Sequence, residues 1–188
     1  MRILAITPGQ GFDPVAWSRV LACGADAFLV REYALSAKVL LEALRWCRRE
    51  APPSMDLWVA GRLDAALAAG CGLHAPEAYP PVDPALLPLS RPLHAEGQWE
   101  SRRGCFQLLV GPVFPTPGKG DPWGPERLLR WLDGLPPEGP SLLALGGVAA
   151  SRMAGIRHPR LEGVALIRGL WQAEDPRRAV EELRAAWA

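Results

Sequence analysis

Short apolar runs and longer amphipathic stretches alternate along the chain from one end to the other. The short runs have the length of buried strands, whereas the longer stretches repeat their apolar positions roughly every three or four residues, as helices with one buried face do. Alternation of this kind is typical of a parallel sheet covered by helices. The pattern predicts eight strands, at residues 3–7, 27–30, 57–60, 72–74, 90–94, 106–110, 141–145 and 164–167.

Six helices are predicted among these strands, at residues 14–23, 36–49, 62–69, 124–132, 149–156 and 175–186. The first has a recognisable start, because Asp13 is suited to cap a helix and Pro14 to its first position. Two connections depart from this pattern. Residues 76–88 are rich in proline and predict at most one turn, and residues 96–103 are barely long enough for a helix.

Eight strand and helix units in 188 residues predict an α/β fold, a compact (β/α)8 TIM barrel that forms one domain over residues 1–188. Barrels of this kind typically have about 250 residues, so the helices and loops of this chain must be short. An open, doubly wound sheet is the alternative that the same alternation allows.

The composition narrows the range of partners. The 21 basic and 20 acidic residues leave a net charge of +1, so no overall field favours nucleic acid or an anionic membrane. No apolar stretch approaches the roughly 20 residues that span a bilayer, and the apolar run at residues 3–6 is too short for a signal peptide. We therefore expect a soluble, cytoplasmic protein. The sequence leaves open whether copies of the chain form a homo-oligomer.

Cysteine and asparagine usage adds two expectations. The four cysteines are widely spaced and form no C-x-x-C pair, which predicts incidental or buried thiols and no metal site on them. Asparagine is absent and proline is frequent, as in proteins from hot environments, although a GC-rich genome would also enrich proline, arginine, alanine and glycine. We expect a thermophilic source.

Candidate chemistry lies at the carboxyl ends of the strands, where (β/α)8 barrels carry their functional residues. Gly146 and Gly147 follow the seventh predicted strand, and Arg168 and Gly169 follow the eighth. Loops at these two places commonly bind phosphate, because glycine lets backbone N–H groups approach the oxygens closely. The same glycines would also suit ordinary strand ends.

Two other strand ends offer charged residues. Lys119 lies with Thr116 in a loop rich in glycine and proline after the sixth strand, where an ammonium and a hydroxyl could reach a phosphate. Arg31 and Glu32 follow the second strand, where the guanidinium could bind an anion and the carboxylate could orient it or act as an acid or base. A solvated lysine and a structural ion pair are the respective alternatives.

Two histidines are candidate catalytic bases. His74 and His94 end neighbouring strands, and imidazole exchanges protons near neutral pH. A structural role is the alternative for each. His158 lies in a loop that leads from a helix to a strand, at the opposite end of the barrel, and is excluded from the site.

The segment from Gly111 to Lys119, with the sequence GPVFPTPGK, resembles the signature loop of the thiamine phosphate synthase and TenI family. Shorter similarities follow the family's order along the chain, at residues 30–32, 72–74, 90–94, 144–148 and 163–167. Together they extend from about residue 26 to the end of the chain. The resemblance implies a role in thiamine biosynthesis and a (β/α)8 barrel, the fold that the apolar pattern predicts.

Departures from the family pattern bear on the reaction. The synthases have an Asn-Asp pair after the third strand and a carboxylate shortly after the fourth, which would hold the magnesium that neutralises departing pyrophosphate. This chain has Ala60-Gly61 in place of the pair and lacks the second acid. Substitution by Glu77 or Asp83 stays open, but nothing in their spacing argues for it. Leu29 and Tyr33 replace the family's glutamine and lysine beside Arg31 and Glu32.

The features that remain resemble the half of the site that binds a thiazole phosphate. This distribution is closer to TenI proteins, which isomerise a thiazole carboxylate phosphate to its aromatic tautomer. That reaction removes one proton and returns another, so it implies no metal and no cofactor. A TenI tautomerase has its catalytic histidine second in the signature loop, where this chain has Pro112, so His74, His94 or Glu32 would have to act as the base. Arg168 stands where the family has a small residue, and either adds a cation or fills the pocket.

Three hypotheses follow, in order of preference. The first is a TenI-like thiazole tautomerase, the second a divergent thiamine phosphate synthase, and the third a barrel that binds a phosphate ligand without chemistry, as a regulator or a structural partner. The partner that the resemblance implies is a small phosphorylated thiazole. Magnesium dependence distinguishes the second from the others, because only pyrophosphate departure needs the charge to be neutralised. Substituting the histidines distinguishes the first from the third.

Overall fold

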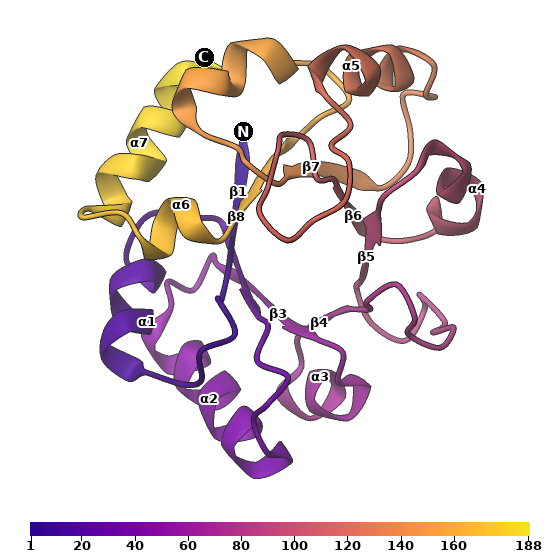
Figure 1. Ribbon diagram of the computed structural model, residues 1–188. Coiled ribbons are helices and arrows are strands. Elements are labelled where there is room, and N and C mark those ends of the chain that lie inside the picture. The colour runs from indigo at the N-terminus through magenta and orange to yellow at the C-terminus, as the bar shows by residue number, and fades with distance from the viewer.

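The computed structural model describes all 188 residues and contains a closed barrel of eight parallel strands that follow one another in chain order (Figure 1). The strands are β1 (Arg2–Ile6), β2 (Ala27–Val30), β3 (Asp56–Ala60), β4 (Gly72–His74), β5 (Leu89–Leu93), β6 (Gln107–Val110), β7 (Ser141–Leu145) and β8 (Gly163–Leu166). Pairing of β1 with β8, in which Ile3 lies opposite Val164, closes the sheet. The predicted (β/α)8 barrel is confirmed, and the open sheet is wrong.

Short helices surround the barrel (Figure 1). They are α1 (Pro14–Leu21), α2 (Ala37–Glu50), α3 (Leu63–Ala69), α4 (Trp99–Arg102), α5 (Pro125–Asp133), α6 (Arg168–Trp171) and α7 (Pro176–Trp187), with two 3-10 segments, η1 (Glu96–Gln98) and η2 (Ala150–Ile156). The Asp13 carboxylate caps α1 by accepting the N–H groups of Val15 and Ala16, as its position predicts. None of these helices combines the length and the apolar character that crossing a bilayer requires.

Three connections differ from the prediction or refine it. Residues 150–156 form a 3-10 helix, whose period of about three residues matches the spacing of the buried Met153 and Ile156. The four-residue helix α6 directly after β8 was not predicted, because so short a stretch carries no periodicity. Residues 76–88 contain five prolines and form turns without a helix, so β4 and β5 lack the usual helical cover.

Apolar side chains form two layers. A cluster of 42 buried residues fills the space between the strands and the helices. A second cluster of nine lies inside the barrel and includes Leu4, Leu29, Trp58 and Leu143. Its largest member, Trp58, lies against Gly72, where a Cβ atom would come within 2.3 Å of the indole ring. Glycine on β4 therefore makes room for the tryptophan that fills this part of the barrel.

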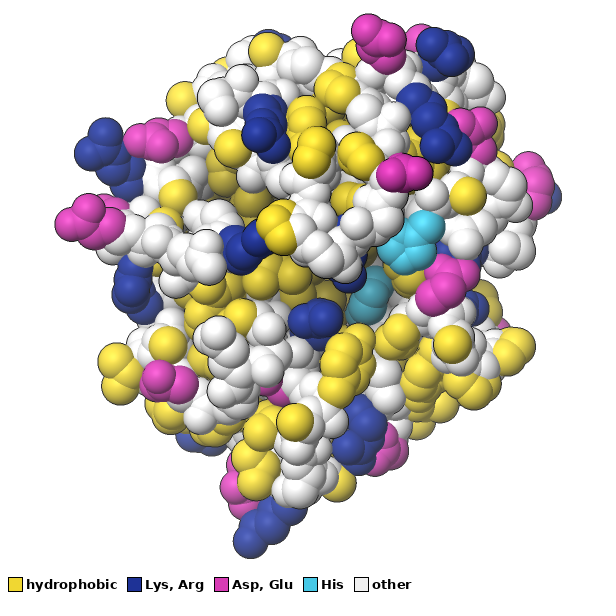
Figure 2. All heavy atoms as spheres, in the orientation of Figure 1, with side chains coloured by type: hydrophobic (Ala, Val, Ile, Leu, Met, Phe, Trp, Pro, Cys, Tyr) yellow, Lys and Arg dark blue, Asp and Glu magenta, His cyan; other side chains and the backbone are white.

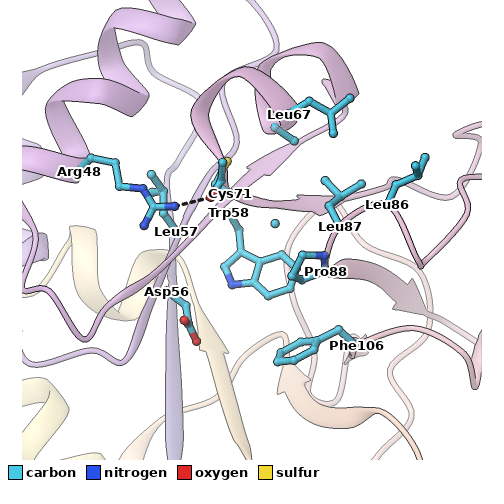
Figure 3. A pocket seen from close by; sticks show the side chains of 13 residues that line it. Arg48, Asp56, Leu57, Trp58, Leu67, Cys71, Leu86, Leu87, Pro88 and Phe106 are labelled. Atoms are coloured by element: carbon cyan, nitrogen blue, oxygen red, sulfur yellow. Dashed lines mark hydrogen bonds between the residues drawn. The ribbon is translucent and has the colours of Figure 1, made fainter.

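A cavity of about 420 Å³ opens at the amino-terminal end of the strands, beside Trp58, Phe106 and Leu86 (Figure 3). The cavity lies where residues 76–88 provide no helix to cover the barrel. Its two charged side chains are already satisfied, because Arg48 donates to the carbonyl oxygen of Gly70 and Asp56 pairs with Arg2. It lies at the end of the barrel opposite to the candidate residues, and no charged group in it needs a ligand.

We predict that Gly163→Ala destabilises the barrel where it closes. A Cβ atom at position 163 would come within 1.8 Å of the Arg2 carbonyl oxygen on β1, and backbone on both sides prevents relief. The free energy of unfolding, measured by urea denaturation, should fall by about 3 kcal/mol. Gly155→Ala is the matched control, because a Cβ atom there meets nothing within 4 Å. Equal stability of the two variants would contradict the prediction.

Candidate functional site

The carboxyl ends of the strands meet on one face of the barrel, and most of the candidate residues lie there. Figure 2 shows a hollow with an apolar floor at the centre of this face, bordered by basic and histidine side chains. The loop between β6 and α5 crosses the middle of the barrel (Figure 1). The barrel thus collects residues from both halves of the chain around one opening.

Glu32 is buried and anchors the loop that follows β1. Its Oε1 accepts the N–H of Gly9 at 2.9 Å, and its Oε2 accepts the N–H of Gly11 at 2.7 Å. Both carboxylate oxygens are therefore engaged by backbone. The neighbouring backbone is held as well, because the N–H of Arg31 donates to the Thr7 hydroxyl at 2.8 Å.

Arg31 presents an unpaired cation. Its guanidinium forms no hydrogen bond and no ion pair, and lies 5.4 Å from the centre of the Tyr33 ring. Stacking on an aromatic ring orients a guanidinium while leaving its N–H groups available to an anion. The charge also lies close enough to His74 to act on its protonation.

His74 is buried, with Nδ1 3.0 Å from the hydroxyl oxygen of Ser90 on the next strand. Burial, followed by the nearby charges of Arg31 and Arg91, lowers the pKa of His74 to about 4. Both causes disfavour a positive ring, so the imidazole is neutral at neutral pH. His74 is therefore available as a hydrogen-bonding group and carries no charge.

His94 follows β5 and is half exposed, and its Nδ1 lies 2.6 Å from the carbonyl oxygen of Gly111. A carbonyl oxygen can only accept, so the neutral ring carries its proton on Nδ1. The lone pair is then on Nε2. The indole N–H of Trp123 donates to the backbone oxygen of His94 at 3.0 Å and fixes the residue from the other side.

The loop after β6 packs tightly against the turn after β7. Its Val113 N–H donates to Leu145 and its Phe114 N–H donates to Gly146, at 2.8 and 3.0 Å. Both glycines of the turn have positive φ, and Cβ atoms would lie 2.7 Å from Pro112 at position 146 and 2.7 Å from Phe114 at position 147. This close packing by itself requires glycine at both positions.

Four candidate residues remain. Lys119, Arg168 and Gly169 lie at the edge of the opening, and Thr116 is held within the loop after β6. Thr116 donates its hydroxyl hydrogen to the Phe114 carbonyl within the loop, at 2.9 Å. Lys119 is exposed and its ammonium has no partner. Arg168 and Gly169 are exposed in the first turn of α6, and the Arg168 guanidinium also has no partner. Lys119 and Arg168 thus add two unpaired cations on this side of the barrel.

Residues 4–170 of this chain match the sequence pattern of the thiamine monophosphate synthase family. The chain belongs to this family. A relative from Geobacter sulfurreducens is 32% identical over 178 residues, which cover 88% of this chain and 82% of the relative. The thiamine-phosphate synthase of Salinibacter ruber is 29% identical over 161 residues, or 78% of this chain and 69% of that protein.

The fold has solved counterparts in the family. The structure of thiamine phosphate pyrophosphorylase from Pyrococcus furiosus superimposes with a TM-score of 0.80, covering 99% of this chain and 95% of that chain. The two sequences are 22% identical, so this likeness concerns the fold alone. Membership in the family confirms the resemblance carried by the signature loop and places the protein in thiamine biosynthesis.

The family resemblance implies magnesium, but the acidic groups of this face do not fit it. Both oxygens of Glu32 accept backbone N–H groups, and one oxygen of Glu77 accepts from Arg102 and Gln98. A magnesium ion is held by carboxylate oxygens that are free to coordinate it. No group of three or more His, Cys, Asp or Glu side chains lies close enough together to hold a metal ion.

Sequence reasoning did not connect the residues that support the two histidines. Ser90 contacts His74, and Gln98, Arg102 and Glu77 form a hydrogen-bonded group next to His94. Ser90 lies in residues 90–94, one of the regions similar to the family, and this similarity could have marked it as a site residue. The other three come from connections whose paths could not be predicted.

We predict that His74 makes the stability of the protein depend on pH. A histidine in the unfolded chain titrates near 6.5 and His74 near 4, so the unfolded chain binds more protons between these values. The contribution is complete above pH 6.5, and about 3 kcal/mol of stability is lost as the pH falls to 4. Urea denaturation at about pH 7 and about pH 4.5 should show a smaller loss for His74→Gln than for the parent. Equal losses would contradict the prediction.

Proposed function

We propose that this protein is a TenI-like isomerase that binds a thiazole carboxylate phosphate and converts it to its aromatic tautomer. The observation that carries the proposal is the contact between His94 Nδ1 and the Gly111 carbonyl, which leaves the lone pair on Nε2. A proton acceptor at the opening of the barrel is what removal of a C–H proton requires. The signature loop of tautomerases carries its histidine at the position of Pro112, next to Gly111. His94 would therefore supply an imidazole at the same part of the site from a different strand.

Among the three candidate bases, the contacts favour His94. Glu32 has both oxygens engaged by the loop after β1, and proton transfer to it would break one of those hydrogen bonds. His74, with a pKa of about 4, is a poor base near neutral pH. We assign His74 the role of a neutral hydrogen-bonding group for the substrate, and Glu32 the role of orienting the loop next to Arg31.

The cations and glycines of the opening would bind the two anionic groups of the substrate. Gly146, Gly147 and Gly169 stand where barrels commonly bind phosphate, with Lys119 and Arg168 as unpaired cations on the same side. Arg31 on β2 is the remaining unpaired cation, and a carboxylate suits its planar fork of donors. The proton removed from one carbon by Nε2 of His94 would be returned to another carbon, and the ring would become aromatic.

Divergent synthase activity is the second candidate, because the named relatives are thiamine-phosphate synthases. That reaction releases pyrophosphate and implies magnesium, for which the acidic residues of this face do not fit. An assay of the same protein with a pyrimidine pyrophosphate and a thiazole phosphate, with and without magnesium, distinguishes the two reactions. Pyrophosphate release that depends on magnesium would favour the synthase and would displace the isomerase proposal.

We predict that the parent protein isomerises the thiazole carboxylate phosphate without added metal and that His94→Gln slows this reaction by about a hundredfold or more. The substitution removes the base but no cation, so the dissociation constant from calorimetric titration should change by no more than about twofold. His158→Gln is the matched control, because His158 pairs with Asp133 at the far end of the barrel. Binding without isomerisation by the parent would favour a sensor, and a full rate in His94→Gln would exclude His94 as the base.

We predict that Lys119→Ala weakens binding of the phosphorylated thiazole by about tenfold, because a charge-assisted contact to phosphate is lost. The side chain is exposed and unpaired, so the melting temperature should not change. Lys38→Ala removes the only other lysine, on α2, and serves as the control. Calorimetric titration measures both variants, and equal affinities would remove Lys119 from the site.

A further inference from the structure

The connection between β4 and β5 is pinned at its start although it has no helix. The Arg91 guanidinium on β5 donates to the carbonyl oxygens of Pro76, Glu77 and Tyr79, at 3.4, 3.3 and 3.2 Å. One side chain thus holds the turn at residues 76–79 against the strand. These contacts fix the backbone of Glu77 and do not involve its carboxylate.

The Glu77 carboxylate is fixed as well. Its Oε1 accepts from Arg102 at 2.6 Å and from Gln98 at 3.1 Å. Arg102 is buried, and Glu77 is its only acidic partner, so the pair keeps a buried cation from being uncompensated. The hydrogen bond from Arg102 lowers the pKa of Glu77 below its usual value, which keeps the carboxylate charged at neutral pH.

The same group of side chains holds His94. The side-chain oxygen of Gln98 accepts the backbone N–H of His94 at 2.8 Å and also accepts from Arg102 at 3.1 Å. The second oxygen of Glu77 has no hydrogen bond and faces Nε2 of the His94 ring at 4.0 Å. A fixed negative charge therefore lies beside the one ring nitrogen that the Gly111 contact leaves unprotonated.

We infer that Glu77 is the positioning residue and charge partner of the His94 base. The inference rests on the proposed function for its chemistry. When Nε2 takes a proton from the substrate carbon, the imidazolium forms 4.0 Å from a carboxylate that Arg102 and Gln98 already hold in place. The charge stabilises the imidazolium until the proton is delivered to the second carbon. No group other than the substrate and His94 gains or loses the proton in this cycle.

Other charged groups lie around Glu77 and His94, and a test of their pairing must leave these groups unchanged. They are His74 on β4, Arg91 on β5, Arg102 on α4, and the ion pair of Glu96 with Arg127. Glu96 provides the matched control, because its side chain is 49% exposed compared with 50% for Glu77, and its ion pair is equally direct, at 2.8 Å. Glu96 has no recorded contact with the His94 ring.

The experiment compares Glu77→Gln with the parent and with Glu96→Gln. The amide keeps an oxygen that can accept from Arg102, so the variant should fold, and thermal melting checks this. The dissociation constant should be unchanged, kcat should fall by about fivefold to tenfold, and the acid limb of the pH–rate profile should move by about half a unit to lower pH. A merely structural role would not move the acid limb. Glu77→Asp keeps the charge and should restore a profile close to that of the parent.

A second readout does not need the isomerase activity. Diethyl pyrocarbonate acylates an unprotonated imidazole nitrogen, and mass spectrometry reports the extent of reaction at His94 as a function of pH. The acid limb of this curve should move to lower pH in Glu77→Gln and remain in place in Glu96→Gln. Coincident curves in all three proteins would overturn the inference. A shifted curve in a protein without isomerase activity would uphold the pairing of Glu77 with His94 while contradicting the proposed function.

Discussion

Backbone hydrogen bonds from Val113 and Phe114 to the end of β7 fasten the loop after β6 across the mouth of the barrel. Such close approach is possible because Gly111, Gly146 and Gly147 have no side chains; at Gly111 a Cβ atom would lie 2.1 Å from the Leu145 carbonyl oxygen. The side of the candidate site that β5, β6 and β7 form depends on this contact. The Gly111 carbonyl oxygen accepts the hydrogen bond from Nδ1 of His94, and Thr116 and Lys119 follow in the same loop.

The charges of this face are distributed unequally. The carboxylates of Glu32 and Glu77 are each held by two donors, whereas the cations of Arg31, Lys119 and Arg168 have no partner. Pinned acids cannot easily be recruited by a cation from solution, and free cations retain their full attraction for an anion. A protein with a net charge of only +1 thereby presents a locally positive opening. The proposed selectivity for a small anionic ligand would follow from which charges are paired, and not from how many there are.

The sequence was sufficient to predict the barrel, because buried parallel strands give continuous apolar runs. It was also sufficient to predict that the candidate residues lie on one face, because the carboxyl ends of such strands meet there. It was insufficient for elements shorter than two turns, such as α6, and it took the 3-10 segment η2 for an α-helix. The sequence identified the candidate site residues but could not show which of the three candidate bases has a free lone pair. The contacts that separate His94 from Glu32 join residues 17 to 23 positions apart in the chain, and no spacing rule anticipates them.

The connection between β4 and β5 has a consequence for how the fold can vary. Beyond the backbone that Arg91 holds, residues 80–85 form hydrogen bonds only within their own turns, and no strand rests on them. Additional residues could enter there without changing the register of the barrel or the position of Glu77. Extra helical turns would lie over the apolar cavity beside Trp58 and Phe106, at the end away from the candidate site. The barrel can thus gain or lose cover on this side while the face with the candidate site stays the same.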